Sequence, residues 1–203
     1  DENGIVANNM LDPAIPGVTF KMSNEAAVED GRWWGKAEPI WVSAEKAGIA
    51  TGTMFWPGSE AEIHGVRPHY SEHYEMAMPS DARVDRALAW LDKPPAERPR
   101  FVTLYFDIVA SAGHEFGPDS AEVNQAAATV DAAIGRLRQG LKARKLAANI
   151  VVVADHGMAP TSSDRLIYID DIIPRDSYTA LDLGPFGTIY PKPGREAEVQ
   201  ALV

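Results

Sequence analysis

Two groups of residues in this chain have the types and spacing that could bind a metal ion. Asp155 and His156 are adjacent and directly follow the apolar run 150–154. His114 follows a second such run, 101–106, after a short segment. Carboxylate and imidazole groups bind zinc at about 2.0–2.2 Å. The pattern indicates a divalent-metal site, and the structural alternative is a turn with a hydrogen-bonded histidine.

Predicted secondary structure places these groups at the ends of two strands. Residues 101–106 and 150–154 are rich in β-branched and other apolar side chains, as is typical of buried strands. A helix is predicted over 119–145, beginning at Asp119, with an apolar stripe that should lie on the sheet. Strand, helix and strand in this order form a βαβ unit, and ligands of open α/β sheets bind at the carboxyl ends of the strands. The two groups are therefore expected to converge on one cleft.

The remaining pattern extends this architecture over the whole chain. Helices are predicted over 38–47 and 81–92, and a strand over 49–55. The alternation predicts an α/β fold with a mostly parallel central sheet and helices on both faces. We expect residues 1–203 to be a single catalytic-type domain, truncated at both ends, because a turn-rich segment opens it and a helical pattern closes it without a capping signal.

Composition excludes several classes of protein. The chain has 19 Lys and Arg against 29 Asp and Glu, a net charge of −10, which disfavours binding to long nucleic acids. It has no cysteine, so disulfides and thiolate metal sites are excluded. Its apolar runs are far shorter than the roughly 20 residues that span a bilayer, so no membrane span is expected.

Six blocks of the sequence resemble a known family. In chain order they read GIVANNMLDP, PIWV, FWPGSE, RPRFVTLYF, SAGHEFGP and ADHGM, at residues 4–13, 39–42, 55–60, 98–106, 111–118 and 154–158. They resemble the nucleotide pyrophosphatase/phosphodiesterase family of the alkaline phosphatase superfamily. The resemblance covers nearly the whole chain and implies an alkaline-phosphatase-like core.

The resemblance also implies a chemistry. Family members use two zinc ions and a threonine nucleophile to hydrolyse phosphodiester or pyrophosphate bonds of small molecules, releasing nucleoside 5′-monophosphates. It suggests a periplasmic or extracellular location. Two alternatives stay open: a phosphomonoesterase or lipid-headgroup phosphodiesterase of the same superfamily, and a non-catalytic nucleotide-binding module.

The resemblance assigns metal ligands and shows where the chain departs from the family. His114 is implied as a ligand of one zinc, and Asp155 with His156 as ligands of the other. The family has an aspartate four residues before this histidine, where the chain has Ala110, whose methyl group cannot coordinate a metal. The family's threonine nucleophile and first aspartate ligand lie upstream of the first block, and a further histidine ligand lies beyond residue 203. We therefore expect residues 1–203 alone to bind zinc weakly and to be inactive, with a complementing chain or segment supplying the rest.

Four residues are implied on the substrate side. Asn8 matches an asparagine whose amide donates to a phosphate oxygen, a catalytic role like that of an oxyanion hole. Tyr105 matches an aromatic residue that lines the nucleobase slot, where stacking tolerates different bases. Trp56 is expected near the same slot, and Glu60 within reach of polar substrate groups. Ordinary turn chemistry for Asn8, and core packing for the two aromatic residues, are the structural alternatives.

Overall fold

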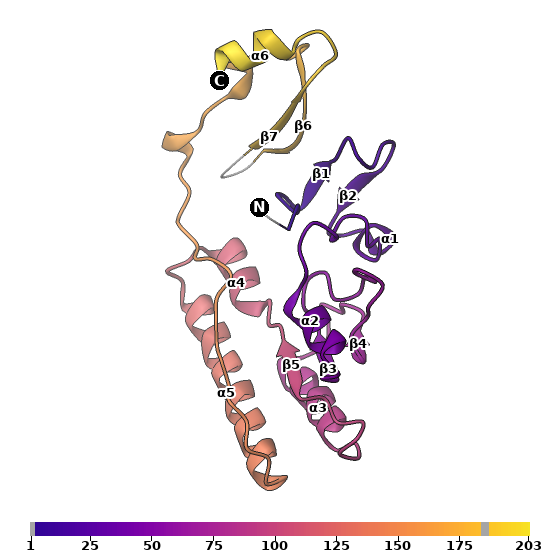
Figure 1. Cartoon of the computed structure of the whole chain (residues 1–203). Coiled ribbons are helices and arrows are strands. Elements are labelled where there is room, and N and C mark those ends of the chain that lie inside the picture. Colours follow the sequence, from indigo (N-terminus) through magenta and orange to yellow (C-terminus); the bar gives the residue numbers. More distant parts are fainter. Residues whose placement is uncertain (1–2, 184–186) are drawn as a thin grey trace. The chain divides into compact units, whose positions relative to one another are not determined.

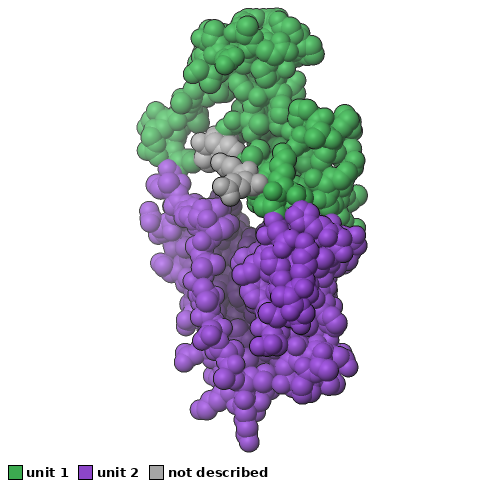
Figure 2. Space-filling model, in the orientation of Figure 1, with its two compact units in different colours: residues 1–37, 161–203 green, residues 38–160 purple. Residues whose placement is uncertain are grey.

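The computed structural model describes residues 3–183 and 187–203, which divide into two compact units (Figure 2). Unit 1 comprises Asp1–Ala37 and Thr161–Val203, and unit 2 comprises Glu38–Pro160. Each unit has its own sheet or sheets and its own buried cluster (Figure 1). Among the described residues, no helix combines the length and apolar character needed to cross a bilayer.

Unit 2 confirms the predicted α/β fold. Its elements, in chain order, are α2 (Ile40–Lys46), β3 (Thr51–Met54), β4 (Tyr70–Glu72), α3 (Ser80–Leu91), β5 (Phe101–Leu104), α4 (Ile108–Phe116) and α5 (Ala121–Ala143). The three strands form a parallel sheet in the order β4-β3-β5. The predicted helices 38–47 and 81–92, and the strands 49–55 and 101–106, correspond to α2, α3, β3 and β5.

Helix α3 packs on the sheet through Trp90. A Cβ atom at Gly52 of β3 would lie 2.7 Å from the Trp90 ring, so glycine is what lets the indole approach the strand this closely. Tyr70 stacks on the same indole at 5.9 Å between ring centroids. Met54, Phe55 and Ala87 complete this buried cluster. The core of unit 2 therefore lies between α3 and the strands.

The long helix forms as predicted but packs differently. It begins after Ser120, whose hydroxyl accepts from the Val123 amide at 3.2 Å, rather than at Asp119. Its apolar stripe packs mainly against α3 and α4 instead of lying on the sheet, with Ala133 and Leu137 in a cluster with α3. Helix α5 therefore packs mainly on two other helices, α3 and α4, and not on the sheet.

The prediction of a buried strand at 150–154 is wrong for this structure, and so is the βαβ unit that it would complete. Residues 150–154 are extended but pair with no strand among the described residues. Val151, Val152 and Val153 are 82%, 69% and 69% exposed. β-Branched residues favour a strand where a neighbouring strand is available, but their β-propensity alone does not produce strand pairing.

Unit 1 is built from two antiparallel hairpins. Its elements are β1 (Asn9–Leu11), β2 (Thr19–Lys21), α1 (Glu25–Val28), the 3₁₀ turns η1 (Ser163–Arg165) and η2 (Ile169–Asp171), β6 (Tyr178–Leu183), β7 (Gly187–Pro191) and α6 (Glu196–Leu202). Strands β1 and β2 pair with each other, as do β6 and β7. Val199 of α6 packs with Tyr178 on the second hairpin. Phe20 of β2 is fully buried against Trp33 and Trp34.

Candidate metal and substrate site

Asp155 and His156 present two donor atoms side by side. Oδ2 of Asp155 lies 3.3 Å from Nε2 of His156. Two ligands at about 2.1 Å from one tetrahedral zinc ion are separated by about 3.4 Å, so this spacing fits a shared metal. Both side chains are largely exposed, so their donor atoms are accessible.

The other ring nitrogen of His156 fixes the orientation of the imidazole. Nδ1 lies 2.8 Å from the carbonyl oxygen of Gly157, and because a carbonyl oxygen only accepts, Nδ1 carries the proton. In the neutral imidazole, Nε2 is then the nitrogen whose lone pair can bind a metal. Metal-binding histidines characteristically donate their second ring N–H to a carbonyl or carboxylate in this way. The His156 amide also donates to Asp155 Oδ1 at 3.0 Å, which holds the carboxylate in place.

Helix α4 carries His114 and the departure at Ala110. No element is predicted from the sequence for the segment after β5, and the structure folds it as a helix from Ile108 to Phe116. Residues four apart share a face of a helix, so position 110 lies one turn from His114. His114 is exposed and Ala110 half-buried. On this face, the methyl group stands where the family resemblance implies a carboxylate ligand.

Gly113 allows the segment after Asp155 and His156 to pack against α4. A Cβ atom at this position would lie 2.5 Å from Sδ of Met158. Met158 is two residues beyond Gly157, and Gly113 immediately precedes His114. The structure thus brings the two predicted ligand-bearing segments into contact at this glycine.

A buried ion pair anchors the start of α4. Nη1 of Arg83 donates to Oδ1 of Asp107 at 2.6 Å, and the side chains are 1% and 10% exposed. The same guanidinium donates to the carbonyl oxygens of Tyr105, Met78 and Met76, so its donors join α3, β5 and the segment before α3. Because a buried guanidinium requires such compensation, this arrangement fixes where β5 ends and α4 begins.

Tyr105 belongs to an aromatic cluster at this strand end. Its ring lies 6.3 Å from that of Tyr74, which contacts Phe55 edge-on at 5.4 Å. Burial raises the pKa of the Tyr105 phenol, and the charges of Asp107 and Asp155 raise it further, which places both carboxylates near this ring. The predicted base-stacking residue and the predicted ligand Asp155 therefore lie in the same neighbourhood of unit 2.

Glu60 and Trp56 are held in the turn after β3. Oε1 of Glu60 accepts from the Tyr74 amide at 2.9 Å, so this carboxylate positions the Tyr74 backbone. The Trp56 carbonyl accepts from the amide and hydroxyl of Ser59 at 3.0 and 2.7 Å, while its side chain is half-buried. Contact of either residue with a substrate stays a prediction.

Asn8 lies in unit 1, immediately before β1. Its side chain is exposed, and its carbonyl oxygen accepts from the Met22 amide at 2.9 Å. The following residue, Asn9, donates to the Asp182 carboxylate through its amide and its side chain. The backbone of Asn8 is therefore fixed while its side chain remains accessible.

Sequence reasoning missed Arg83, Asp107 and Tyr74. The Arg83 position did carry a signal, because it shares the apolar face of α3 with Ala87 and Trp90 at spacings of four and seven. A charged residue on such a face requires a buried partner. Its identification as Asp107, 24 residues later, needed the structure.

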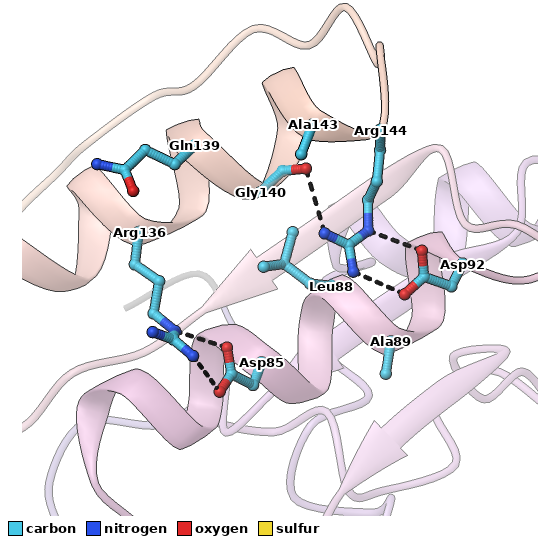
Figure 3. Close-up of a pocket in the computed structure, with 9 residues that line it drawn as sticks. All are labelled: Asp85, Leu88, Ala89, Asp92, Arg136, Gln139, Gly140, Ala143 and Arg144. Atoms are coloured by element: carbon cyan, nitrogen blue, oxygen red, sulfur yellow. Dashed lines mark hydrogen bonds and ion pairs between the residues drawn. The ribbon is translucent and has the colours of Figure 1, made fainter.

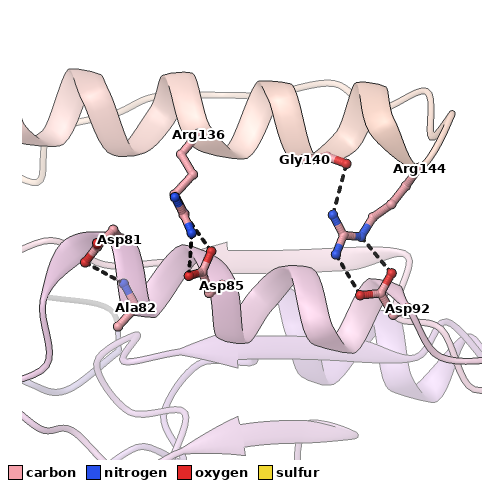
Figure 4. Close-up of polar contacts among 7 residues, drawn as sticks. All are labelled: Asp81, Ala82, Asp85, Asp92, Arg136, Gly140 and Arg144. Atoms are coloured by element: carbon pink, nitrogen blue, oxygen red, sulfur yellow. Dashed lines mark hydrogen bonds and ion pairs between the residues drawn. The ribbon is translucent and has the colours of Figure 1, made fainter.

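A groove between α3 and α5 is lined by charged residues that are already paired. It has a volume of about 550 Å³ (Figure 3). Its charged residues pair with one another: Arg136 with Asp85 at 2.6 and 2.7 Å, and Arg144 with Asp92 at 2.7 Å (Figure 4). These two bidentate ion pairs connect α5 to α3, and we assign the groove a structural role.

Comparison with known families gives one match over the entire chain. The family model described as "Type I phosphodiesterase / nucleotide pyrophosphatase" matches residues 1–203. An uncharacterized pyrophosphatase/phosphodiesterase of Schizosaccharomyces pombe is 41% identical over 189 residues, which cover 92% of this chain and 39% of that protein. Ectonucleotide pyrophosphatase/phosphodiesterase family member 3 of Rattus norvegicus is 39% identical over 180 residues, 88% of this chain and 20% of that protein.

Solved structures agree with these matches. An inactive variant of murine ectonucleotide pyrophosphatase/phosphodiesterase 5, in complex with AMP, superposes with a TM-score of 0.88 at 32% sequence identity. The superposition covers 100% of this chain and 54% of the murine chain. The chain therefore spans about half the length of this structure and less of the curated relatives.

Proposed function

This chain belongs to the type I phosphodiesterase / nucleotide pyrophosphatase family, a family of phosphoric diester hydrolases in the alkaline phosphatase superfamily, and on that premise we propose that its full-length protein is a zinc-dependent nucleotide phosphodiesterase. The substrates are small nucleotide esters or pyrophosphates, and the product is a nucleoside 5′-monophosphate. The AMP bound to the murine relative supports this choice of product.

The spacing of Asp155 and His156 is the observation that carries the metal assignment. Their donor atoms lie 3.3 Å apart with the imidazole oriented by Gly157, which fits one zinc ion without rearrangement. We assign these two residues to one zinc and His114 to the second. Bound zinc ions supply Lewis-acid stabilisation of the phosphoryl oxygens.

We assign the substrate contacts to the residues that the family resemblance implies. Asn8 donates its side-chain amide to a phosphate oxygen, and its fixed backbone supports this role. Tyr105 stacks on the base, with Trp56 beside it; the aromatic cluster around Tyr105 supports this assignment. Glu60 reaches polar groups of the substrate; its carboxylate also accepts from the Tyr74 amide at 2.9 Å.

We further propose that Ala110 impairs the second zinc site. His114 would be left without the carboxylate expected one helical turn earlier, and a stable zinc site uses three or four protein ligands. The consequence is partial metal occupancy and a slow enzyme.

A segment or chain outside residues 1–203 is proposed to complete the sheet and the ligand set. The run Val151–Val153 supports this, because it is exposed, pairs with none of the described strands and is suited to pairing with a further strand. We also propose an extracellular or periplasmic location, supported by the designation of the rat relative as an ectonucleotide enzyme.

The test uses the full-length protein and measures bound zinc together with hydrolysis of three nitrophenyl esters. The esters are those of a nucleotide, of phosphate and of phosphocholine. Fastest cleavage of the nucleotide ester, with zinc bound, is expected. A faster phosphate or phosphocholine ester would replace the nucleotide assignment with one of the other two superfamily activities.

Variants locate the metal in the same experiment. His156→Ala should lower zinc content and activity at least ten-fold, because it removes a direct ligand. His69→Ala, an exposed histidine of the same unit placed outside the site, is the matched control and should change neither. Unchanged zinc content in His156→Ala would overturn the metal assignment.

Ala110 favours one second candidate, a nucleotide-binding module without catalysis. In that case AMP binds to the full-length protein with zinc removed, and none of the three esters is cleaved. Calorimetry with AMP, with and without zinc, separates this candidate from the enzyme.

A further inference from the structure

The outer edge of β1 is closed by side chains of the β6–β7 hairpin. One edge of β1 pairs with β2. On the opposite edge of β1, the Asn9 amide donates to Oδ2 of Asp182 at 3.1 Å, and the Leu11 amide donates to the Tyr190 hydroxyl at 2.8 Å. Two alternate amides of this short strand are thus bonded to side chains from a segment more than 170 residues away.

Asp182 makes the more extensive of these two contacts. Besides the amide bond, Nδ2 of Asn9 lies 3.0 Å from Oδ1 and 3.2 Å from Oδ2 of Asp182. The carboxylate is half-buried, and none of the ion pairs between described residues involves it. Hydrogen bonds to a carboxylate are stronger than those between neutral groups, so Asn9 is held firmly.

An irregularity in β6 accompanies this contact. The register moves from Ala180 opposite Ile189 to Asp182 opposite Thr188, so β6 contains one extra residue, Leu181. Such a bulge bends the strand and redirects the side chains beside it, and bulges are frequent next to active sites. Asp182 is the first paired residue after the bulge.

The peptide unit between Asn8 and Asn9 is consequently bonded at both ends. Its carbonyl oxygen, from Asn8, accepts from the Met22 amide at 2.9 Å. Its N–H, from Asn9, donates to Asp182 at 3.1 Å. A peptide plane held in this way fixes the position of the Asn8 Cα atom and the direction of its Cα–C bond, and the Asn8 side chain leaves the backbone from that atom.

We propose that Asp182 is a positioning residue for Asn8, which rests on the phosphate-binding role proposed for Asn8 above. An amide that stabilises charge in a transition state is effective only if it is oriented before the reaction. Asp182 supplies this orientation through Asn9 and makes no contact with the substrate itself. Loss of Asp182 therefore affects kcat rather than substrate binding.

The test is a kinetic cycle in the full-length protein with a nitrophenyl nucleotide ester. Asp182→Ala is expected to lower kcat about 10- to 100-fold with little change in KM, because small misplacements of catalytic groups have effects of this size. Asp182→Asn keeps an acceptor for the Asn9 amide and should recover most of the loss. Tyr190→Phe is the matched control: it removes the hairpin's bond to Leu11, beyond Asn9, and should leave kcat nearly unchanged.

The double variant separates positioning from a general structural role. In an Asn8→Ala background, Asp182→Ala should cause no further loss of kcat, because the residue through which it acts is gone. Additive losses, or equal losses in Asp182→Ala and Tyr190→Phe, would overturn the proposal. Thermal unfolding is measured for every variant. If Asp182→Ala does not fold, the comparison is made with Asp182→Asn. That variant should show a smaller kcat loss, and the loss should also vanish in the Asn8→Ala background.

Failure of this inference can be told from failure of the proposed function. If Asn8→Ala has normal kcat, the role proposed for Asn8 is wrong. If Asn8→Ala is impaired while Asp182→Ala has normal kcat, the function stands and the positioning role is wrong.

Discussion

Single residues decide how complete the candidate metal site is. Asp155 and His156 offer a ready pair of donor atoms, and the carbonyl of Gly157 selects which imidazole nitrogen is available. On α4, by contrast, Ala110 places a methyl group one turn before His114, where the family resemblance implies a carboxylate. The two halves of the site are therefore unequal, and restoring the weaker half is the most direct test.

We predict that Ala110→Asp in the full-length protein raises zinc content and phosphodiesterase rate together. A direct carboxylate ligand is expected to increase both about ten-fold or more, since even residues that only orient ligands change affinity 10- to 100-fold. Zinc content and hydrolysis of a nitrophenyl nucleotide ester are the measurements.

The control for this prediction is Ala112→Asp. It adds the same charge to α4, but two residues from either position it lies on a different face of the helix. It should increase neither quantity. An unchanged rate in Ala110→Asp would show that position 110 does not contribute to the metal site.

At the scale of elements, the contact between α3 and α5 depends on a glycine. A Cβ atom at Gly140 would lie 2.4 Å from Cδ1 of Leu88, a buried side chain, whereas one at Gly135 would meet no atom within 4 Å. Both glycines lie in the same helix. Their environments alone distinguish them, which makes them a matched pair.

We predict opposite effects of alanine at these two positions. Gly135→Ala should stabilise the protein by about 1 kcal/mol, because alanine is the better helix former. Gly140→Ala should destabilise it by about 1–2 kcal/mol, since overpacking against Leu88 outweighs that gain. Chemical unfolding measures both changes. Equal stabilisation by the two variants would show that α3 and α5 can move apart at Gly140 without lowering the free energy of unfolding.

The two ion pairs between these helices predict a pH dependence. The partner arginines hold the pKa of Asp85 and of Asp92 below the ordinary carboxyl value. A carboxyl group with a lowered pKa in the folded state stabilises that state above its unfolded pKa, near 4, and loses the contribution as pH falls through its folded pKa.

The unfolding temperature of the double variant Asp85→Asn/Asp92→Asn should therefore lie below that of the parent at pH 7. The difference should shrink as the pH falls below about 4 and through the folded-state pKa of the two carboxyl groups. High salt at pH 7 should reduce the difference, because both pairs are exposed. A difference that does not shrink below about pH 4 and is not reduced by salt would mean that the pairs do not act through charge.

At the scale of the whole molecule, the described residues offer few ligands for each metal. In the proposed assignment, His114 binds one zinc and Asp155 with His156 binds the other, whereas a stable site uses three or four protein ligands. We predict that residues 1–203 alone bind zinc weakly and hydrolyse no nucleotide ester. Titration calorimetry that shows two tight zinc sites would contradict this. His156→Ala should abolish the weak zinc binding assigned to Asp155 and His156.

The sequence by itself determined the local features of this protein. Periodicity predicted α2, α3 and α5, and β-branched runs predicted β3 and β5, because helix and strand patterns are set by neighbouring residues. The adjacency of Asp155 and His156 predicted a pair of donors for the same reason. The family resemblance, carried by six short blocks, was confirmed over the whole chain.

Only the tertiary structure decided what depends on distant partners. The 150–154 run has the composition of a buried strand, yet it stays exposed because no described strand pairs with it. The Arg83–Asp107 and Asn9–Asp182 contacts join residues 24 and 173 positions apart. Such contacts follow from the path of the folded chain, which local patterns do not specify.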